Sequence, residues 1–416
     1  MKICEYSSCT ACGACVNVCG KKAISLIEDS EGFLYPSINE SSCVNCGVCK
    51  KVCPINNHLS RSAAEFYMAW NKDDDILQRS SSGGVFSALA AYVLTRKGVV
   101  FGAIKNPDTQ EVYHTMVDNI QGIDPLRLSK YYQSDTRKTY QQVRELLIQN
   151  KFVLFTGTAC QIAGLYSALS HWKIDSELIL GTTKRRLITM DVLCHGCTSK
   201  KLVDNYIKTK EKKYNKKIEN YHFRVKTRDT GWHSGGGTRM KIEFADGTNT
   251  VEDNVKDTFF VGFNNYLFLR ESCYQCQFCG IDRISDFTLA DFWGINPGKV
   301  NAKQMQLGVS VMCVNTAIAM KMIPELSAYI YIEAIDKNEV IPYNLAFTRP
   351  GNRPQIRDSI FTQITNSNFD FAIKRVCWKH YLKADIKQCI IKCIGESKFR
   401  EIMFIVKKIL KGRNSL

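Results

Sequence analysis

Eight cysteines near the start of the chain form two runs with the same spacing. The first run, CTACGACVNVC, begins at Cys9, and the second, CVNCGVCKKVC, begins at Cys43. In each run three cysteines stand two residues apart and a fourth follows after three more residues. Zinc sites usually take two separated pairs of ligands instead. A disulfide framework is also disfavoured, because no apolar export segment precedes the cysteines and cytosolic thiols stay reduced.

The spacing C-x2-C-x2-C-x3-C is typical of bacterial ferredoxins, which hold two [4Fe–4S] clusters. In that arrangement the first three thiolates of a run bind one cluster, and the fourth binds the other. The sequence therefore predicts one cluster on Cys9, Cys12, Cys15 and Cys53, and a second cluster on Cys43, Cys46, Cys49 and Cys19. Pro54 follows the second run, whereas Gly20 stands at the equivalent place in the first. We expect residues 1–57 to form a complete two-cluster ferredoxin domain.

The length and composition indicate a larger protein than a ferredoxin. The 416 residues predict two or three domains, and 45% hydrophobic residues are enough for a substantial core. Nowhere do about 18 uncharged apolar residues run together, so the sequence predicts a cytoplasmic protein without a membrane-spanning helix. The net charge of +16 favours acidic partners, but no zinc-finger or aromatic RNA-binding motif accompanies it. We therefore expect no nucleic-acid partner.

Three segments of the body, 79–103, 151–169 and 187–197, alternate buried strands with helices, which predicts a mixed α/β domain. Serines and the Gly83–Gly84 pair open the first helix, where hydroxyls and free amides can bind a phosphate. Serine is also the ordinary residue at a helix start, so both interpretations stay open. The third segment ends in polar residues that include His195, which is either a ligand contact or a structural histidine.

A third group of cysteines, Cys273, Cys276 and Cys279, repeats the C-x2-C-x2-C spacing. No fourth cysteine follows closely, so a further ligand has to come from elsewhere in the fold. Cys160, in the first turn of a predicted helix, and Cys194, at the end of a predicted strand, are the obvious donors. A helix start suits a thiolate because the helix dipole stabilises negative charge there. The sequence therefore predicts a third metal site.

Four stretches, SSSGGVFSALAAYVL, VLFTGTACQIAGLYSAL, VLCHG and RISDFTLADFWGI, carry a resemblance to a known family. Over residues 1 to about 350 the chain resembles the coenzyme F420 hydrogenase/dehydrogenase beta subunits. The resemblance implies FAD beside a further [4Fe–4S] cluster on Cys160, Cys194, Cys273 and Cys276, with Cys279 in reserve. It also implies cofactor contacts from Ser81, Ser82, Gly83, Gly84, Thr156, Gly157, Thr158, Asp191 and Asp291, and catalytic roles for Lys130 and His195.

The predicted domains are a ferredoxin domain over 1–57, a flavin and iron–sulfur domain over 62–350, and a basic helical extension over 351–416. We expect an oxidoreductase with three [4Fe–4S] clusters and FAD, which exchanges electrons with a redox partner protein or a small-molecule donor or acceptor. The alternative is an electron-transfer or scaffold subunit that turns over nothing itself. Relatives with this ferredoxin fusion often stand among polysaccharide-assembly genes, which suggests that pathway.

The end of the chain has its own pattern. Residues 398–416 combine apolar and basic side chains, as helices that lie on a membrane surface do. A helix docked on the protein body with its basic face in water is the alternative interpretation. The sequence therefore leaves a peripheral membrane contact as one hypothesis for this tail, and it does not predict an oligomeric state.

Overall fold

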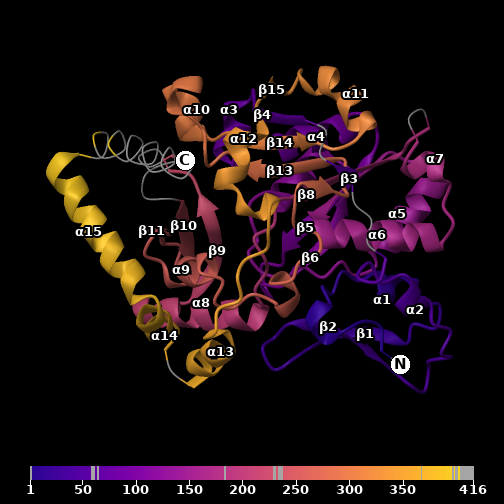
Figure 1. Cartoon of the computed structure of the whole chain (residues 1–416), viewed down its shortest axis with the longest axis horizontal. Coiled ribbons are helices and arrows are strands. Elements are labelled where there is room, and N and C mark those ends of the chain that lie inside the picture. The colour runs from indigo at the N-terminus through magenta and orange to yellow at the C-terminus, as the bar shows by residue number, and fades with distance from the viewer. Residues whose placement is uncertain are drawn as a thin grey trace, which may run out of the picture.

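An eight-stranded mixed sheet forms the centre of the computed structural model (Figure 1), which describes residues 2–57, 61–62, 65–181, 184–227, 231–232, 238–366, 368–395, 398 and 402. Across the sheet the strands are β15 (Ile330–Ala334), β4 (Glu65–Asn71), β14 (Ser310–Val314), β13 (Phe287–Asp291), β8 (Leu187–Val192), β7 (Val153–Thr158), β5 (Val99–Lys105) and β6 (Val112–Val117). The four strands from β13 to β5 are parallel, and every other pairing is antiparallel. The predicted mixed α/β fold is confirmed.

The central strands are apolar on both faces because helices cover both. Phe101 and Phe155 point to one face, where α5 (Thr139–Ile148) and α6 (Ala159–His171) pack. Val100 and Leu154, the neighbouring residues, point to the other face, where α4 (Val85–Leu94) and α11 (Ala317–Leu326) pack. Successive side chains of a strand alternate between faces, so each strand serves two cores. The predicted helix and strand of 79–103 correspond to α4 and β5.

The ferredoxin-type domain lies against α5 and α6, on the outer side of the helical layer (Figure 1). Its elements are α1 (Ala14–Val18), β1 (Ile24–Glu28), β2 (Leu34–Ile38) and α2 (Val48–Lys51). The carbonyl oxygen of Cys12 accepts hydrogen bonds from the hydroxyls of Tyr140, at 2.6 Å, and Thr136, at 3.2 Å. Gly13 has φ +84° and faces Thr136, so a side chain there would be strained and would clash. The two domains are therefore packed and hydrogen-bonded together.

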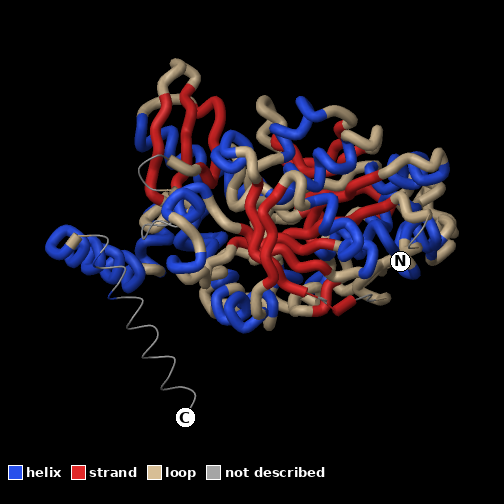
Figure 2. Tube along the Cα trace, turned by 90° about the horizontal axis from the view of Figure 1, so that it is seen from above, coloured by secondary structure: helices blue, strands red, loops and turns tan. Residues whose placement is uncertain are grey.

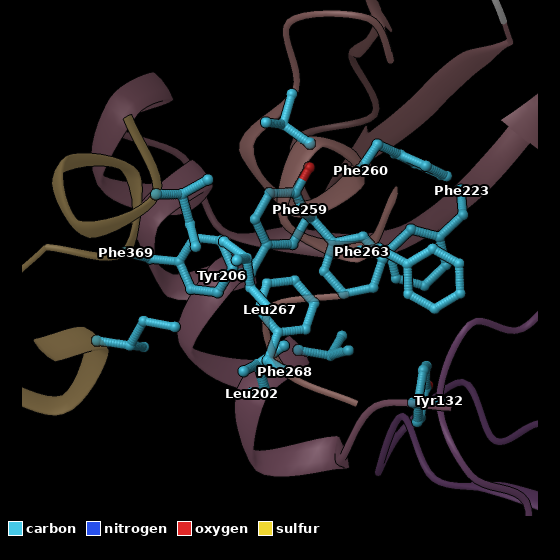
Figure 3. Packing of buried hydrophobic residues seen from close by; sticks show 14 of the residues in the cluster. Tyr132, Leu202, Tyr206, Phe223, Phe259, Phe260, Phe263, Leu267, Phe268 and Phe369 are labelled. Carbon is cyan, nitrogen blue, oxygen red and sulfur yellow. The ribbon is translucent and has the colours of Figure 1, made fainter. Parts of the chain in front are cut away.

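A second lobe contains a β-meander of β9 (Ile218–Val225), β10 (Arg239–Phe244) and β11 (Asn249–Asp253). Its core is aromatic. Phe259 lies between Tyr206 and Phe223, with ring centroids at 5.4 and 4.8 Å (Figure 3). Helices α8 (Lys200–Tyr214), α9 (Thr258–Asn264), α13 (Arg357–Asn366) and α14 (Phe369–Val376) contribute to this core. Part of the predicted C-terminal extension is thus integral to this lobe.

The remaining elements are short, apart from the last helix. They are α3 (Asp74–Gln78), α7 (Ser176–Ile179), α10 (Ala302–Leu307), α12 (Lys337–Val340), the paired β3 (Arg61–Ser62) and β12 (Asp282–Arg283), and α15 (Trp378–Ile394). Within the described ranges, no helix has the length and apolarity needed to cross a membrane. The predicted membrane-surface tail, 398–416, lies outside the described residues apart from two isolated positions.

Candidate iron–sulfur and cofactor sites

The structure gathers the first predicted cluster ligands around one cavity. Cys9, Cys12, Cys15 and Cys53 line the same small pocket and are each buried. Gly13 and Gly47, between ligands of the two runs, both take left-handed backbone conformations at the start of short helices. That bend directs backbone amides towards the sulfur atoms, as iron–sulfur sites require. The donor set fits a [4Fe–4S] cluster, in which each thiolate binds a different iron.

A fifth thiol, Cys4, lies beside this set, and the sequence patterns did not single it out. Its hydrogen bond to Cys9 lowers the pKa of the Cys9 thiol to about 6, with further help from the positive charge of Arg270. A hydrogen bond from Cys4 also lowers the pKa of Cys53. Stabilised thiolates are the form that binds iron. Cys4 stands five residues before the first run, outside the spacing, so only the fold reveals this contact.

The second predicted set lies nearer the surface. Cys49 is buried, Cys19 and Cys43 are partly exposed, and Cys46 is exposed. Cys49 lies close enough to Cys46 and Cys19 for their negative charges to raise its pKa, although burial is the larger cause. The amide of Ala23 donates to the sulfur of Cys19 at 3.3 Å. This arrangement places the second candidate cluster near solvent, where an external redox partner has access.

The third predicted set, Cys160, Cys194, Cys273 and Cys276, converges from three elements. Cys160 lies in the first turn of α6, Cys194 follows β8, and the last two belong to the loop before β12. Burial is the main cause that raises the pKa of Cys160 to about 12, and the neighbouring charges of Cys276 and Cys273 add to it. The pKa of Cys194 is raised by burial and by the other three members of the set. Four partly buried thiols whose charges act on one another need cationic metal to become thiolates.

Hydrogen bonds to sulfur favour the ligands that the resemblance implies. The Gly196 amide donates to Cys194 at 3.3 Å, and the Thr158 hydroxyl lies 3.1 Å from the sulfur of Cys160. The thiol of Cys279 instead donates to the carbonyl oxygen of Ala346 at 3.0 Å. Cys197 is nearer, because its sulfur lies 4.0 Å from that of Cys273. Cys197 is therefore the one neighbouring thiol in the described chain that competes with Cys194.

A cubane and a single zinc ion require different donor spacings. Among the described residues, no group of three His, Cys, Asp or Glu side chains converges closely enough for one metal ion. Thiolates around a cubane bind four separate irons, so they stand farther apart than the ligands of a tetrahedral zinc site. The C-x2-C-x2-C-x3-C spacing of the first two sets favours clusters over zinc.

A buried arginine connects the first and third cysteine sets. The Arg270 guanidinium is 1% exposed, lies 4.1 Å over the Tyr35 ring, and donates to the Cys9 carbonyl oxygen at 2.7 Å. Burial works to lower its pKa, but Tyr35, followed by the thiols of Cys197, Cys9 and Cys273, raises it above the usual value. No carboxylate of the described residues lies within ion-pair distance of this arginine. The countercharge for Arg270 therefore has to come from the sulfur sites on either side.

The predicted flavin residues Ser81 and Lys130 come from adjacent segments. The Ser129 amide donates to the hydroxyl of Ser81 at 3.2 Å, which joins the loop before α4 to the segment that carries Lys130. The Lys130 ammonium donates to the carbonyl oxygens of Pro125, at 2.9 Å, and Arg127, at 2.6 Å. Burial, followed by the charge of Lys105, lowers the pKa of Lys130 to about 7. This lysine is held close to another cation in a poorly solvated position.

Three further basic residues, none of them singled out by the sequence, surround this segment. Burial lowers the pKa of Lys105, at the end of β5, to about 8, and that of Lys226, after β9, to about 7. Lys226 donates to the carbonyl oxygen of Ser82 at 2.7 Å. His114 is buried, and burial lowers the pKa of its ring to about 4. The backbone hydrogen bond with Thr156 opposes this shift, and the charge of Lys130 adds to it. Lysines at strand ends are the signal that would have located this site.

None of the three lysines, Lys105, Lys130 and Lys226, forms an ion pair with a carboxylate in the part of the chain that the structure describes. Lys105 donates to the side-chain oxygen of Asn220 and the carbonyl oxygen of Tyr221, so its polar contacts are also uncharged. Desolvated cations without counterions are costly unless an anion binds among them. A cofactor with phosphate groups would supply the missing countercharge for Lys105, Lys130 and Lys226, which we together call the basic pocket.

Thr156, Gly157 and Thr158 form the end of β7, beside the basic pocket. The carbonyl oxygen of Thr156 lies 3.0 Å from Nε2 of His114, and Thr158 caps α6 through reciprocal bonds with Gln161. A side chain at Gly157 would meet Gln161 and His114. These residues place the strand end between the basic pocket and Cys160.

The glycines and aspartates predicted as cofactor contacts are engaged with protein. Gly83 packs against β4 and β14, and Gly84 has φ +71° at the start of α4, so close packing and backbone conformation account for both glycines. Asp191 is fully buried in an ion pair with Arg283, at 2.7 Å. Asp291 binds Arg224 through both oxygens, at 2.6 and 2.7 Å. Direct cofactor contact from Asp191 and Asp291 remains a prediction.

His195 lies between the third cysteine set and the aromatic core. Its ring stacks on Tyr266 at 4.5 Å and contacts Phe263 at 4.9 Å. Burial lowers its pKa, and its Nε2 atom is buried with no hydrogen-bond partner among the described residues. A neutral histidine with a free ring nitrogen is available to a bound cofactor or substrate.

Comparison with protein families assigns each part of the chain. A 4Fe-4S dicluster domain matches residues 8–57. The N-terminal model of the coenzyme F420 hydrogenase/dehydrogenase beta subunit matches residues 66–138, and its C-terminal model matches residues 150–340, which together exceed half of the chain. The chain belongs to the coenzyme F420 hydrogenase/dehydrogenase beta-subunit family. The two family models cover the third cysteine set and all predicted flavin residues. The dicluster match identifies an iron–sulfur protein, and the family is one of oxidoreductases.

Among solved structures, a subunit of the F420-reducing [NiFe] hydrogenase complex from Methanosarcina barkeri, in a xenon-derivatised form, is similar to the chain. The two are 14% identical, the match covers 76% of this chain and 91% of that chain, and the TM-score is 0.45. A comparison with curated protein sequences found no match. The family assignment therefore rests on the family models.

Proposed function

We propose that this protein is a flavin-dependent iron–sulfur oxidoreductase in which the ferredoxin-type domain and the body exchange electrons within one chain. The donor sets support two [4Fe–4S] clusters in the first domain and a third on Cys160, Cys194, Cys273 and Cys276. The basic pocket and the end of β7 would hold FAD. A bound flavin supplies a junction between two-electron and one-electron chemistry.

The observation that carries the proposal is the placement of two thiols around α6. Cys160 lies in the first turn of this helix, and Gly164 lies one turn later on the same face. Gly164 packs against Cys12, because a side-chain carbon built there would lie 2.9 Å from the Cys12 sulfur. One helical turn rises about 5.4 Å. A cysteine of the first ferredoxin set therefore lies beside the third set, with no solvent-exposed segment between them.

The flavin part of the proposal is supported by charge. The pyrophosphate of FAD carries negative charge, and Lys105, Lys130 and Lys226 lack carboxylate partners among the described residues. Lys105 stands at the carboxyl end of β5, which pairs in parallel with β7, and open α/β sheets bind ligands at this edge. Deazaflavin F420, named in the family description, and intermediates of polysaccharide assembly are the substrates that we would screen first.

The test is anaerobic purification of the full chain, followed by iron, sulfide and flavin analysis. Three cubanes predict about twelve irons per chain, and one flavin should be released on denaturation. Cys276→Ser should lower the iron content to about eight and leave the ferredoxin-type clusters. Cys279→Ser, in the same run but bonded to Ala346, is the matched control and should retain about twelve.

Flavin binding is tested separately with Lys130→Gln, which should lose flavin and keep all of its iron. Substrate reduction is then followed by the flavin absorbance in the presence of each candidate donor and acceptor. A protein with about eight irons and no flavin would contradict the proposal and favour an electron-transfer subunit. A protein with about twelve irons but no flavin would support the proposed third cluster and contradict the proposed flavin site.

A further inference from the structure

Helix α15 projects from the second lobe at the edge of the molecule (Figures 1 and 2). Its first turns are attached to the body, since Nε2 of His380 lies 2.9 Å from the carbonyl oxygen of Val255 and Asp385 pairs with Lys256 at 2.6 Å. Beyond these contacts the helix extends away from the sheet. This observation is independent of the iron–sulfur and flavin sites.

A stripe of large apolar side chains winds along α15, and each of them is more than one third exposed. The stripe consists of Trp378, Leu382, Ile386, Ile390 and Ile394, which are between 37 and 56% exposed. These residues recur every four positions, and the stripe is about 24 Å long at 1.5 Å per residue. A helix that faces only water normally has polar residues there. Such a stripe therefore indicates a surface that is covered by a partner.

The charge around the stripe indicates which partner covers it. Lys379 and Lys383 are exposed beside the apolar side chains. Residues 371–416 contain twelve Lys and Arg against three Asp and Glu, a net charge of +9 out of the whole chain's +16. A second copy of this helix would bring like charges together, which disfavours self-association through the stripe. An anionic surface with an apolar interior matches both the charge and the apolar side chains.

We propose that α15 binds the surface of an anionic lipid bilayer, with the stripe at the boundary between headgroups and acyl chains. Trp378 lies at the end nearest the protein body, and Lys379 and Lys383 would extend their ammonium groups to lipid phosphates. The protein is then a peripheral membrane protein whose redox sites stay in the aqueous phase. The tail 398–416 continues the same basic segment along the sequence.

The test uses the full-length, cluster-loaded protein and vesicles of phosphatidylcholine, with or without phosphatidylglycerol. The wild type should co-sediment with the anionic vesicles, bind less to pure phosphatidylcholine, and dissociate at high salt. Leu382→Glu with Ile386→Glu should weaken binding by more than about tenfold, because two apolar contacts are replaced by like-sign repulsion. Ile148→Glu, at an equally exposed apolar site on α5, is the matched control and should bind normally.

Three outcomes would overturn the proposal. In the first, the wild type and the double variant bind anionic vesicles equally well, which would assign binding to the tail rather than to α15. In the second, neither protein binds the vesicles. In the third, the wild type forms dimers in sedimentation velocity and the double variant does not, which would make a second copy of the chain the partner of the stripe. In the expected case, Trp378 fluorescence shifts to the blue with anionic vesicles, and Trp378→Phe loses that shift.

Discussion

The Nε atom of Arg270 donates a hydrogen bond to the carbonyl oxygen of Cys9 across the interface between the ferredoxin-type domain and the body, at 2.7 Å. The same guanidinium donates to the carbonyl oxygen of Leu34 at 2.9 Å and to Gln133 at 2.8 Å. Its charge acts on cysteines of two sets: it adds to the Cys4 hydrogen bond that lowers the pKa of Cys9, and it opposes the rise in the pKa of Cys273 that Cys197 and burial cause. One residue of the body thus combines domain docking with electrostatics at two candidate cluster sites.

Arg270→Gln should lower the midpoint potentials of the first and third clusters. A nearby cation stabilises the more negative, reduced form of a cluster, so its removal makes reduction harder. The measurement is a redox titration followed by electron paramagnetic resonance. Arg357→Gln is the control, because this buried arginine at the same interface is already paired with Glu31. A drop of equal size in both variants would show that loosened docking, and not charge, causes the effect.

Cys194→Ser and Cys197→Ser should differ in iron content. The Gly196 amide donates to the sulfur of Cys194, which supports that residue as the ligand, whereas Cys197 lies 4.0 Å from Cys273. We expect the Cys194 variant to lose about four irons and the Cys197 variant to keep them. The reverse result would move the fourth ligand to Cys197 and leave the site otherwise in place.

Gly164→Ala should separate the ferredoxin-type domain from α6. The added carbon would lie 2.9 Å from the Cys12 sulfur and 3.1 Å from the Tyr140 hydroxyl, inside van der Waals contact. Overpacking of this kind costs about 1–3 kcal/mol. Denaturant unfolding should show the loss, and limited proteolysis should cut between the domains sooner. Gly20→Ala, with no atom within 4 Å of the added carbon, should behave as the wild type.

Flavin affinity should fall as the pH rises above about 7. The pKa of Lys130 is about 7 in the folded protein, below its unfolded value of about 10.4. Lys130 therefore lowers the free energy of unfolding by its full amount below pH 7, and this loss shrinks as the pH rises towards about 10.4. A bound phosphate favours the protonated lysine, so binding takes up a proton in that range. Calorimetry with FAD should show affinity decreasing by up to about tenfold per pH unit. Lys130→Gln should bind weakly with a flatter pH profile.

Several parts of the fold follow from periodicity in the sequence. The alternation of Val100 and Phe101 between two cores is the period-two pattern of a doubly covered strand, and Thr158 with Gln161 is a recognisable helix start. The first two cysteine sets follow from spacing alone, because all eight residues lie within one short segment. The C-x2-C-x2-C run, with Cys160 and Cys194 at element ends, also predicts the third site, but the choice of ligands within it required a family resemblance, since the set spans more than a hundred residues.

Other features depend on contacts that no local pattern encodes. Arg270 follows an apolar stretch, and in sequence it resembles an ordinary surface arginine. It is buried because the ferredoxin-type domain covers it. Asp191 stands near a strand end, where a ligand contact is expected, but it is paired with Arg283 of β12. Gly84 resembles a phosphate-binding glycine in sequence, yet its positive φ at the start of α4 gives it a structural requirement of its own.

The hydrogen bonds that hold α1 on α5 also determine how electron delivery depends on concentration. A free ferredoxin has to meet its partner in every cycle, so its delivery rate falls when either protein is diluted. Here the Gln141 side-chain amide donates to the carbonyl oxygen of Asn17 at 2.6 Å, and the Asn17 side chain donates to the carbonyl oxygen of Arg137 at 2.7 Å. The two domains therefore stay docked within one chain. Under the proposed function, electron transfer between them is a unimolecular event that is insensitive to expression level.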